Sequence, residues 1–286
     1  MRHPATDHHP VPADWLIPRW PAIAGVQAVF TTRQGGHSQA PWDSFNLGTH
    51  VGDDAVAVAR NRQQLHDCLS TLSGRAVQAH FMEQVHGWAV HALPGEGGAL
   101  RGDACVTATA GQACTIMVAD CLPVLIAHRQ VGVVGAAHAG WRGLLGQEGY
   151  GVLEALWDAY CRLLRQHGAA IGSDASTVAA QTQVWLGPCI GPRAFEVGAE
   201  VYQAFTRQDR QAQRCFAAAA QPGKWYADLA GLARQRLHRL GLQALYGNDS
   251  STEWCTFSNP SRFFSHRRDA AVLGSTGRMA AVIWRS

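Results

Sequence analysis

The sequence lacks the long hydrophobic segment of a transmembrane helix, because no run of about 18 apolar residues occurs in its 286 residues. It also lacks a Walker phosphate-binding loop, a dinucleotide-binding glycine fingerprint and any CxxC pair. The formal net charge of +3 is too small to indicate nucleic acid or an anionic membrane as a partner. The first 21 residues contain no apolar core of a secretory signal. No protein partner is indicated either.

The chain does contain enough apolar sequence for a large buried core. Apolar residues make up 47% and charged residues 16% of the chain, which excludes intrinsic disorder. Its eight cysteines, in a chain of this size without a signal peptide, are typical of reduced and mostly buried thiols. We therefore expect a cytoplasmic protein. The sequence predicts one α/β domain over residues 26–286 and a loosely ordered leader over residues 1–25.

The spacing of apolar residues predicts the main secondary-structure elements. Short apolar or β-branched runs predict strands at residues 26–31, 81–86, 114–119, 123–127, 131–137, 184–186 and 279–284. The run at 131–137 is continuously apolar, so we expect that strand to be buried on both faces. Helical spacing predicts a helix that Asp53 and Asp54 could cap, and further helices within residues 153–164, after Gly198, and within residues 229–240 with Asp228 as the N-cap.

Three side chains that can ligate a metal lie at the ends of predicted strands. They are His86 in Gln-Val-His-Gly, Cys121 in Ala-Asp-Cys-Leu-Pro, and His138 in Ala-His-Ala-Gly-Trp-Arg-Gly. Two imidazoles and a thiolate suit Zn²⁺, and three protein ligands leave a fourth position for water. The gaps between them match no short zinc motif, so the residues alone leave two interpretations open. One is a metal site, and the other is a core thiol with two hydrogen-bonded histidines.

A second group of residues is cationic and lies beside glycines. Arg33 precedes Gly35-Gly36, Arg142 lies between Trp141 and Gly143, and Arg267 with Arg268 precedes Asp269. Glycine lets backbone N–H groups approach an anion, and guanidinium groups bind phosphate in a bidentate manner. Each arginine alone is more typical of a solvated face or a structural ion pair. Only convergence on one cleft would indicate a phosphate site.

Taken in order, these motifs form a series that covers nearly the whole chain, from Phe30 to Trp284. The series is Arg33-Gln34-Gly35-Gly36-His37-Ser38, Phe45-Asn46-Leu47-Gly48, Gln84-Val85-His86-Gly87, Ala119-Asp120-Cys121, Ala137-His138-Ala139-Gly140-Trp141-Arg142-Gly143, Gly187-Pro188-Cys189-Ile190-Gly191-Pro192, Phe195-Glu196-Val197-Gly198 and Arg267-Arg268-Asp269. It resembles the YfiH-like family, whose members are named laccase-domain or polyphenol oxidase proteins and also purine nucleoside phosphorylases. Each motif is weak alone, but the ordered set is specific.

The resemblance implies a single fold of mixed β-sheets flanked by helices, in α/β/β/α layers. It implies phosphorolysis of adenosine, inosine, guanosine and 5′-methylthioadenosine, and deamination of adenosine. It also implies that His86, Cys121 and His138 bind Zn²⁺, with Cu²⁺ as the other metal that such a site accepts. The expected partners are therefore purine nucleosides and phosphate.

Roles for further residues follow from these two reactions. In phosphorolysis, phosphate attacks C1′ of the ribose, and we expect Arg33, Arg142 or Arg267 to hold it. Asn46 and Gln84 are candidates for binding the nucleoside. In deamination, water activated by the metal attacks C6 of adenine while a carboxylate moves the proton. The candidate carboxylates are Asp120 and Asp103, and Arg142 is a further candidate for a catalytic residue.

Three other classes of protein remain as alternatives. A copper-dependent polyphenol oxidase needs several copper sites, and none of the 14 histidines forms a His-x-His pair. A thiol hydrolase would use Cys121 as the nucleophile and His138 as the base. A metal-binding module without catalysis would convert no nucleoside at all.

Overall fold

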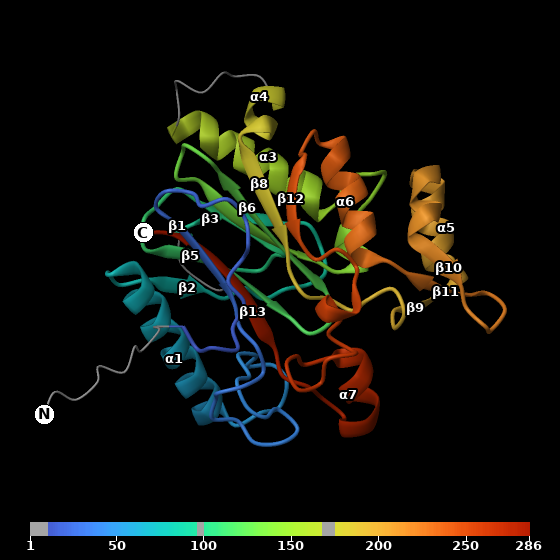
Figure 1. The fold of residues 1–286 in the computed structure, drawn as a ribbon, viewed down its shortest axis with the longest axis horizontal. Coiled ribbons are helices and arrows are strands. Elements are labelled where there is room, and N and C mark those ends of the chain that lie inside the picture. Colours follow the sequence, from blue (N-terminus) through green and yellow to red (C-terminus); the bar gives the residue numbers. More distant parts are fainter. Residues whose placement is uncertain (1–10, 96–99, 168–174) are drawn as a thin grey trace, which may run out of the picture.

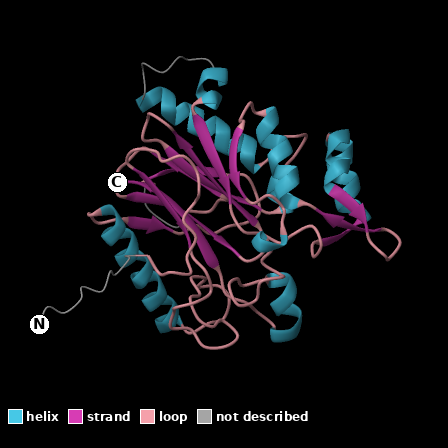
Figure 2. Ribbon diagram, in the orientation of Figure 1, coloured by secondary structure: helices cyan, strands magenta, loops and turns pink. Residues whose placement is uncertain are grey.

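The computed structural model describes residues 11–95, 100–167 and 175–286, and its strands form three sheets. Two sheets stack face to face in the centre, and helices cover their outer faces (Figure 1). Figure 2 shows the same arrangement, with strands inside and helices outside. The predicted α/β fold with layered mixed sheets is therefore confirmed.

Each sheet joins strands that lie far apart in the sequence. The four-stranded sheet has the order β1-β13-β5-β2, the six-stranded sheet β12-β8-β6-β7-β4-β3, and a small sheet β10-β11-β9. Parallel and antiparallel pairs occur in both large sheets. The strands are β1 Val26–Phe30, β2 Gln78–His80, β3 Val90–Leu93, β4 Ala104–Thr107, β5 Gln112–Val118, β6 Leu122–His128, β7 Val134–Ala139, β8 Thr182–Leu186, β9 Glu196–Gly198, β10 Phe216–Ala218, β11 Lys224–Ala227, β12 Ala244–Gly247 and β13 Met279–Arg285.

Three apolar cores hold the layers together. Between the two large sheets, Phe30 and Ile116 of one sheet pack with Leu125 and Trp185 of the other. A second core joins helix α1 (Ala55–Ser73) to the outer face of the four-stranded sheet. A third core joins α3 (Val152–His167) and α6 (Leu229–Arg239) to the outer face of the six-stranded sheet. Strands β5, β6 and β7 are thus covered on both sides, which explains their unbroken apolar sequence.

Two of the helices, α1 and α6, begin where an aspartate side chain binds free N–H groups of the first turn. Asp54 accepts from the N–H groups of Val56 and Ala57 at the start of α1, and Asp228 accepts from Gly231 in α6. Both N-caps and both helices are as predicted. The helices are α1 Ala55–Ser73, α2 Trp141–Leu145, α3 Val152–His167, α4 Ala175–Ala180, α5 Ala199–Gln208, α6 Leu229–Arg239 and α7 His266–Leu273, with 3₁₀ turns at Arg210–Cys215 and Thr252–Trp254.

The strand predicted at residues 81–86 is wrong. The strand of this region is β2, which ends at His80, and the chain then leaves the sheet. The side chain of Gln84 continues the pairing with β5 instead, because its amide bonds both the N–H and the carbonyl of Met117 at 2.8 Å. His86 has a φ of +58°, so the backbone turns there rather than extending.

The second half of the predicted leader, residues 11–25, packs on the domain rather than being loosely ordered. Val11 and Trp15 are buried, and the indole of Trp15 lies 5.3 Å from the ring of Phe45. Leu16 and Phe30 exchange backbone hydrogen bonds beside the four-stranded sheet. Val11 and Trp15 belong to the core that contains Leu65 and Leu69 of α1, and the composition of the segment does not reveal this packing. Residues 1–10 lie outside the described part.

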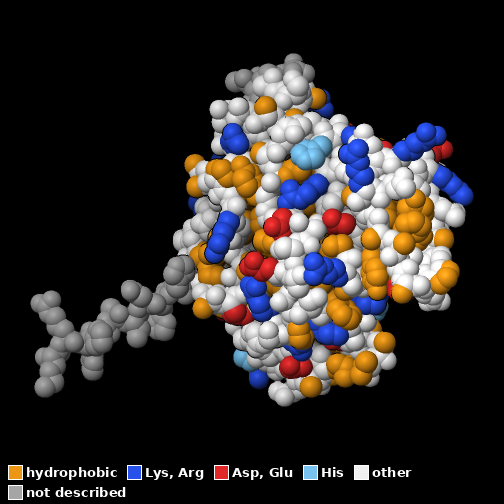
Figure 3. All heavy atoms as spheres, turned by 45° about the vertical axis from the view of Figure 1, so that its right-hand side comes forward, with side chains coloured by type: hydrophobic (Ala, Val, Ile, Leu, Met, Phe, Trp, Pro, Cys, Tyr) orange, Lys and Arg blue, Asp and Glu red, His pale blue; other side chains and the backbone are white. Residues whose placement is uncertain are grey.

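Within the described residues, no helix is long and apolar enough to cross a membrane. On the face shown in Figure 3, Lys and Arg side chains are interspersed with Asp and Glu side chains. This face therefore has no continuous basic surface of the kind that binds nucleic acid.

Candidate functional site

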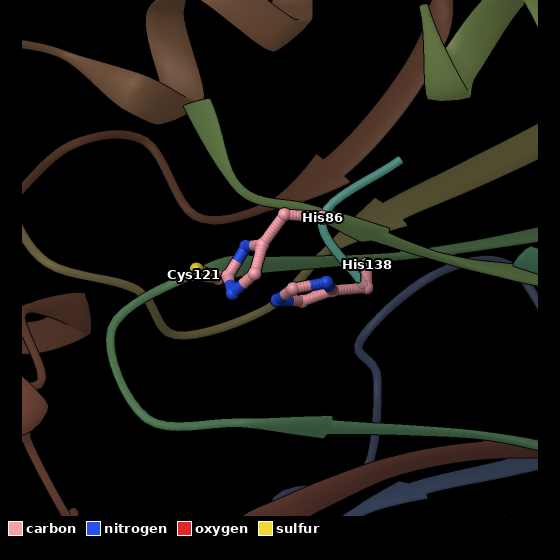
Figure 4. A group of neighbouring side chains, drawn as sticks. All are labelled: His86, Cys121 and His138. Atoms are coloured by element: carbon pink, nitrogen blue, oxygen red, sulfur yellow. The ribbon is translucent and has the colours of Figure 1, made fainter. Parts of the chain in front are cut away.

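Two neighbouring strands and one turn bring the three predicted metal ligands together. Cys121 directly precedes β6, and His138 lies in β7, which pairs antiparallel with β6. His86 comes from the turn that follows β2. The ligand atoms of the three side chains lie within 4.8 Å of one another. In Figure 4 the side chains point toward a common centre.

A single buried carboxylate holds both histidines of this group. Oδ1 of Asp103 lies 2.8 Å from Nδ1 of His138 and accepts the backbone N–H of His86 at 2.9 Å. Its other oxygen accepts the N–H groups of Gly87 and Val85. The backbone carbonyl of Asp103 also accepts the N–H of His138. Asp103 is fully buried, so these contacts orient the histidines, and Nε2 of His138 is left to face the centre.

The electrostatics of the group favour a thiolate. Burial raises the pKa of Cys121, but the charge and hydrogen bond of His138, followed by those of His86, lower it to about 6. Burial lowers the pKa of His138, whereas the Cys121 thiolate and Asp103 together raise it to about 9. The thiol is therefore poised to lose its proton near neutral pH, as a metal ligand must.

Two glycines allow the surrounding backbone to approach the ligands. A Cβ atom on Gly140 would lie 2.9 Å from Nδ1 of His86 and 3.0 Å from Sγ of Cys121. A Cβ atom on Gly143 would lie 2.6 Å from the carbonyl oxygen of Gly87. The Ala-Gly-Trp-Arg-Gly segment therefore closes over the His86 turn only because these positions carry no side chain. Two imidazoles, one thiolate and a supporting carboxylate fit a divalent metal ion of borderline softness.

The three ligands open into a cavity of about 730 Å³. Its lining combines apolar, cationic and histidine side chains and contains only two acidic ones. The lining residues are Thr49, His50, Arg62, Phe81, Met82, Glu83, Gln84, His86, Met117, Val118, Ala119, Asp120, Cys121, His138, Trp141, Arg142, Ile190, Phe195, Leu229, His266, Arg267 and Arg278. The size is that of a small-molecule site, and the residue types suit an anion beside a flat apolar group.

Asp120 is the acidic residue of the cavity that adjoins a ligand, Cys121. Its backbone has a φ of +93°, which turns the side chain away from the path of the strands. Oδ1 accepts the hydroxyl proton of Thr256 at 2.6 Å, and Oδ2 accepts the N–H of Arg267 at 2.7 Å. The carboxylate is thus fixed beside the metal ligands by groups from the start of α7 and the loop before it.

Two further predicted residues, Arg142 and Arg267, line the cavity, and each side chain also contacts a neighbouring residue. Arg142 lies over its neighbour Trp141, with Cζ at 4.4 Å from the ring centroid. Arg267 donates to the carbonyl of Glu196 at 2.9 Å. Both are exposed. Gln84 also lines the cavity, but its amide is used on Met117, so it orients the segment that carries His86.

Two predicted binding residues do not reach the cavity lining. Arg33 forms an ion pair with Asp43, donates to the carbonyl of Pro260 and lies over the ring of Phe264. Asn46 is fully buried and bonds the backbone of Gly48 and of Arg278. Both residues therefore hold loops in place, and the sequence-based assignment of phosphate to Arg33 and ribose to Asn46 is corrected.

Sequence reasoning missed four basic residues of the cavity, one of which is the exposed His266 at the start of α7. The other three are His50, Arg62 and Arg278, which come from the loop before α1, from α1 itself and from the residue before β13. None belongs to a glycine-rich motif of the kind that drew attention to Arg142. Their only sequence signal is a basic residue near a glycine, as in Thr276-Gly277-Arg278, and that signal is common.

Comparisons with known proteins agree with this architecture. The family model described as multi-copper polyphenol oxidoreductase laccase matches residues 27–286. A purine nucleoside phosphorylase of Pseudomonas aeruginosa is 45% identical over 94% of this chain and 98% of its own length. The purine nucleoside phosphorylase YfiH of Escherichia coli is 42% identical over the same shares. A Neisseria meningitidis protein of family DUF152 superposes with a TM-score of 0.79 at 39% identity, covering 96% of this chain and 99% of its own. The chain therefore belongs to the YfiH-like family, whose family model carries the laccase description.

Proposed function

We propose that the protein is a zinc-dependent purine nucleoside phosphorylase. We further propose that it accepts adenosine, inosine, guanosine and 5′-methylthioadenosine and also deaminates adenosine. The observation that carries the proposal is the convergence of His86, Cys121 and His138 on a cavity whose other charged groups are mostly cationic. The names of relatives at 42–45% identity support the same reaction class.

Phosphorolysis requires one bond to form and one to break at C1′ of the ribose. A phosphate oxygen forms the new C–O bond while the C1′–N9 bond breaks, and the electron pair of that bond goes to the purine. The purine then takes up a proton, so the products are the free base and ribose 1-phosphate. When bound, a zinc ion would supply Lewis-acid polarisation at the reacting groups.

The residues of the chain account for the remaining requirements. Phe81, Met117 and Phe195 provide apolar surface for a purine and the less polar face of a ribose. Arginines of the cavity lining provide positive charge for the phosphate. We assign Asp120 to proton transfer at the purine, because it lies beside Cys121 and two donors fix its carboxylate. Asp103 has no free access to the cavity, so we assign it to orientation of His86 and His138.

The proposal is tested with zinc-loaded enzyme and adenosine, with and without phosphate. We expect adenine and ribose 1-phosphate only when phosphate is present, and inosine with ammonia in either case. Cys121→Ser should lose its zinc and slow phosphorolysis at least a hundredfold. Cys68→Ser, which changes a half-buried thiol on α1, is the matched control and should keep both zinc and activity. The proposal fails if wild-type enzyme makes no ribose 1-phosphate, or if Cys121→Ser keeps its turnover.

One observation favours thiol chemistry as a second candidate. The thiol of Cys121 interacts with His138, which in turn is hydrogen-bonded to Asp103, and this is the order of a cysteine hydrolase. The second imidazole, His86, has no place in that arrangement but completes a metal site. Iodoacetamide should inactivate a thiol hydrolase while chelators do not. A zinc enzyme should give the reverse result, with Cys121 protected until the metal is removed.

The copper oxidase named in the family description requires several copper sites. In the described part of the chain, only one group of three His, Cys or carboxylate ligands lies close enough to hold a metal. We therefore propose no phenol oxidation for this site. Oxidation of a phenol by a preparation that contains zinc alone would contradict us.

A further inference from the structure

Three basic residues that sequence reasoning missed line the cavity, and we refer to them as its basic wall. They are His50, Arg62 and Arg278. Arg62 on α1 donates from Nε to the carbonyl of Leu47 at 2.9 Å, and its guanidinium carbon lies 3.9 Å from the ring centroid of Phe81. Arg278 donates from Nη1 to the carbonyls of Thr276 and Gly277. Both guanidinium groups keep further N–H groups for a ligand, because each has five.

Neither of these two half-buried arginines is neutralised by a carboxylate. Within the described residues, Arg62 and Arg278 form no ion pair at 4.0 Å or less. Three other arginines that are shielded from water do have one, and they are Arg33 with Asp43, Arg236 with Glu154 and Arg268 with Asp269. The half-buried Arg234 and Arg262 also lack one, but neither lines the cavity. An unpaired charge that is partly removed from water is costly, so a bound anion would stabilise this wall.

His50 lines the same cavity as the two arginines. Burial lowers the pKa of His50, and the charges of Arg278 and Arg62 lower it further. These effects favour the neutral imidazole, in which one ring nitrogen can still donate a hydrogen bond to an anion. Arg142 and Arg267 differ because they are exposed, and water already screens their charge.

This wall lies next to the metal ligands. Arg278 lines the same cavity as Cys121 and Asp120. Burial lowers the pKa of Arg278, and the charges of those two groups raise it. Arg62 directs Nη2 toward the sulfur of Met117, on the strand that leads to Asp120.

We propose that His50, Arg62 and Arg278 form the subsite that binds the phosphate nucleophile. The inference rests on the proposed function for the identity of the anion, and on the unpaired arginines for the place. Two guanidinium groups match the oxygens of a phosphate dianion, and the imidazole supplies a further donor.

Asn46 and Gly48 support this subsite from behind. Oδ1 of Asn46 accepts the backbone N–H groups of Gly48 and Arg278, so it ties the loop before α1 to the start of β13. A Cβ atom on Gly48 would lie 2.8 Å from Cγ of Arg278, so glycine is needed for the arginine to lie where it does. Asn46 is thus a positioning residue for the phosphate subsite.

The test measures phosphate binding separately from turnover. Zinc-loaded wild type, Arg62→Gln and Arg278→Gln are dialysed to equilibrium against labelled orthophosphate, and KM values for phosphate and inosine are measured in parallel. We expect each variant to weaken phosphate binding and raise the phosphate KM at least tenfold, while the inosine KM changes less than threefold. Arg62→Lys keeps the charge and should recover part of the affinity. Arg60→Gln changes an exposed arginine of α1 outside the lining of this cavity, so it is the matched control and should bind phosphate as wild type does. Arg142→Gln and Arg267→Gln test the exposed arginines of the cavity in the same assay.

The outcomes separate this inference from the proposed function. If Arg142→Gln or Arg267→Gln weakens phosphate binding while Arg62→Gln and Arg278→Gln do not, the subsite is wrong and phosphorolysis stands. If Arg62→Gln and Arg278→Gln lose phosphate but wild type makes no ribose 1-phosphate, the anion site stands and phosphorolysis is wrong. Zinc content and thermal unfolding are measured for every variant. A variant that misfolds would contain less zinc or unfold at a lower temperature, and Arg62→Lys would then lose phosphate binding as fully as Arg62→Gln.

Discussion

The carboxylate of Asp103 lies 2.8 Å from Nδ1 of His138, and the same oxygen accepts the backbone N–H of His86. Two metal-ligand candidates that are 52 residues apart in the sequence (138 − 86) therefore depend on one fully buried side chain. This contact fixes the positions of both histidines, so they lie close together before a metal binds.

Asp103→Asn is expected to weaken zinc binding about tenfold to a hundredfold. An amide keeps the shape of the side chain, but its NH₂ group would face either His138 or the N–H groups of the turn at residues 85–87. A buried donor would then lack a partner, which also lowers the free energy of unfolding by about 1–3 kcal/mol. Competition with a chelator measures the affinity, and denaturant unfolding of the metal-free protein measures the stability.

Asp120→Asn is the matched control for this variant, because it makes the same chemical change at a carboxylate of the cavity lining. It should slow turnover while zinc affinity stays within threefold of wild type. Equal zinc affinity in Asp103→Asn and wild type would show that Asp103 does not organise the centre.

The metal-free enzyme should contain one unusually acidic thiol. The pKa of Cys121 is lowered to about 6, whereas burial and Asp67 raise the pKa of Cys68, and burial raises that of Cys161 to about 11. The thiolate is the form that reacts, so alkylation of Cys121 should increase through pH 6 and level off by about pH 8. An ordinary thiol would continue to react faster up to pH 9.

The measurement is the rate of iodoacetamide alkylation of chelator-treated enzyme from pH 5 to pH 9, located by peptide mass. Cys121→Ser reports the background from the other cysteines. Zinc-loaded enzyme should resist alkylation at Cys121 across the whole range. A rate that rises steadily to pH 9 would mean that the two imidazoles do not stabilise the thiolate.

Much of the fold could be predicted from the sequence because it depends on local patterns. Unbroken apolar runs predicted β5 to β7, and Asp54 and Asp228 predicted the N-termini of α1 and α6. The positions of His86, Cys121 and His138 at the ends of predicted strands made them candidates for a metal site, and the resemblance to a family favoured that interpretation. Spacing alone left the choice open, since it does not reveal the hydrogen bonds by which Asp103 holds the two histidines across the chain.

The remaining errors in the prediction have two causes. In one case a side chain takes the place of backbone pairing in a sheet, and in the other the tertiary structure determines which residues an arginine contacts. The amide of Gln84 takes the place of a strand next to β5, and no periodicity reveals this. Arg33 and Arg278 both lie near glycines, and only the folded structure shows that Arg33 meets Asp43 while Arg278 meets no carboxylate within 4.0 Å in the described chain.

Gly140→Ala should weaken zinc binding at least tenfold while the overall fold is retained. The φ of Gly140 is −65°, which alanine adopts freely, so backbone strain does not contribute. The new methyl group would instead press on His86 and Cys121, at 2.9 and 3.0 Å. Chelator competition measures the affinity, and circular dichroism checks the fold. Zinc affinity equal to that of wild type would mean that the two ligands can shift without cost.

Thr256→Val tests the assignment of Asp120 to proton transfer. Valine keeps the volume of the fully buried threonine but removes the hydroxyl that donates to Oδ1 of Asp120. The carboxylate then keeps only the N–H of Arg267, and a hydrogen bond to a charged group is worth about 1.5–3 kcal/mol. We expect kcat to fall at least tenfold, with little change in the KM for phosphate or nucleoside and with zinc content intact. Thr256→Ser restores the hydroxyl and should recover most of kcat. If the serine variant is as slow as the valine variant, Thr256 acts through packing and the orientation of Asp120 is not what limits the reaction.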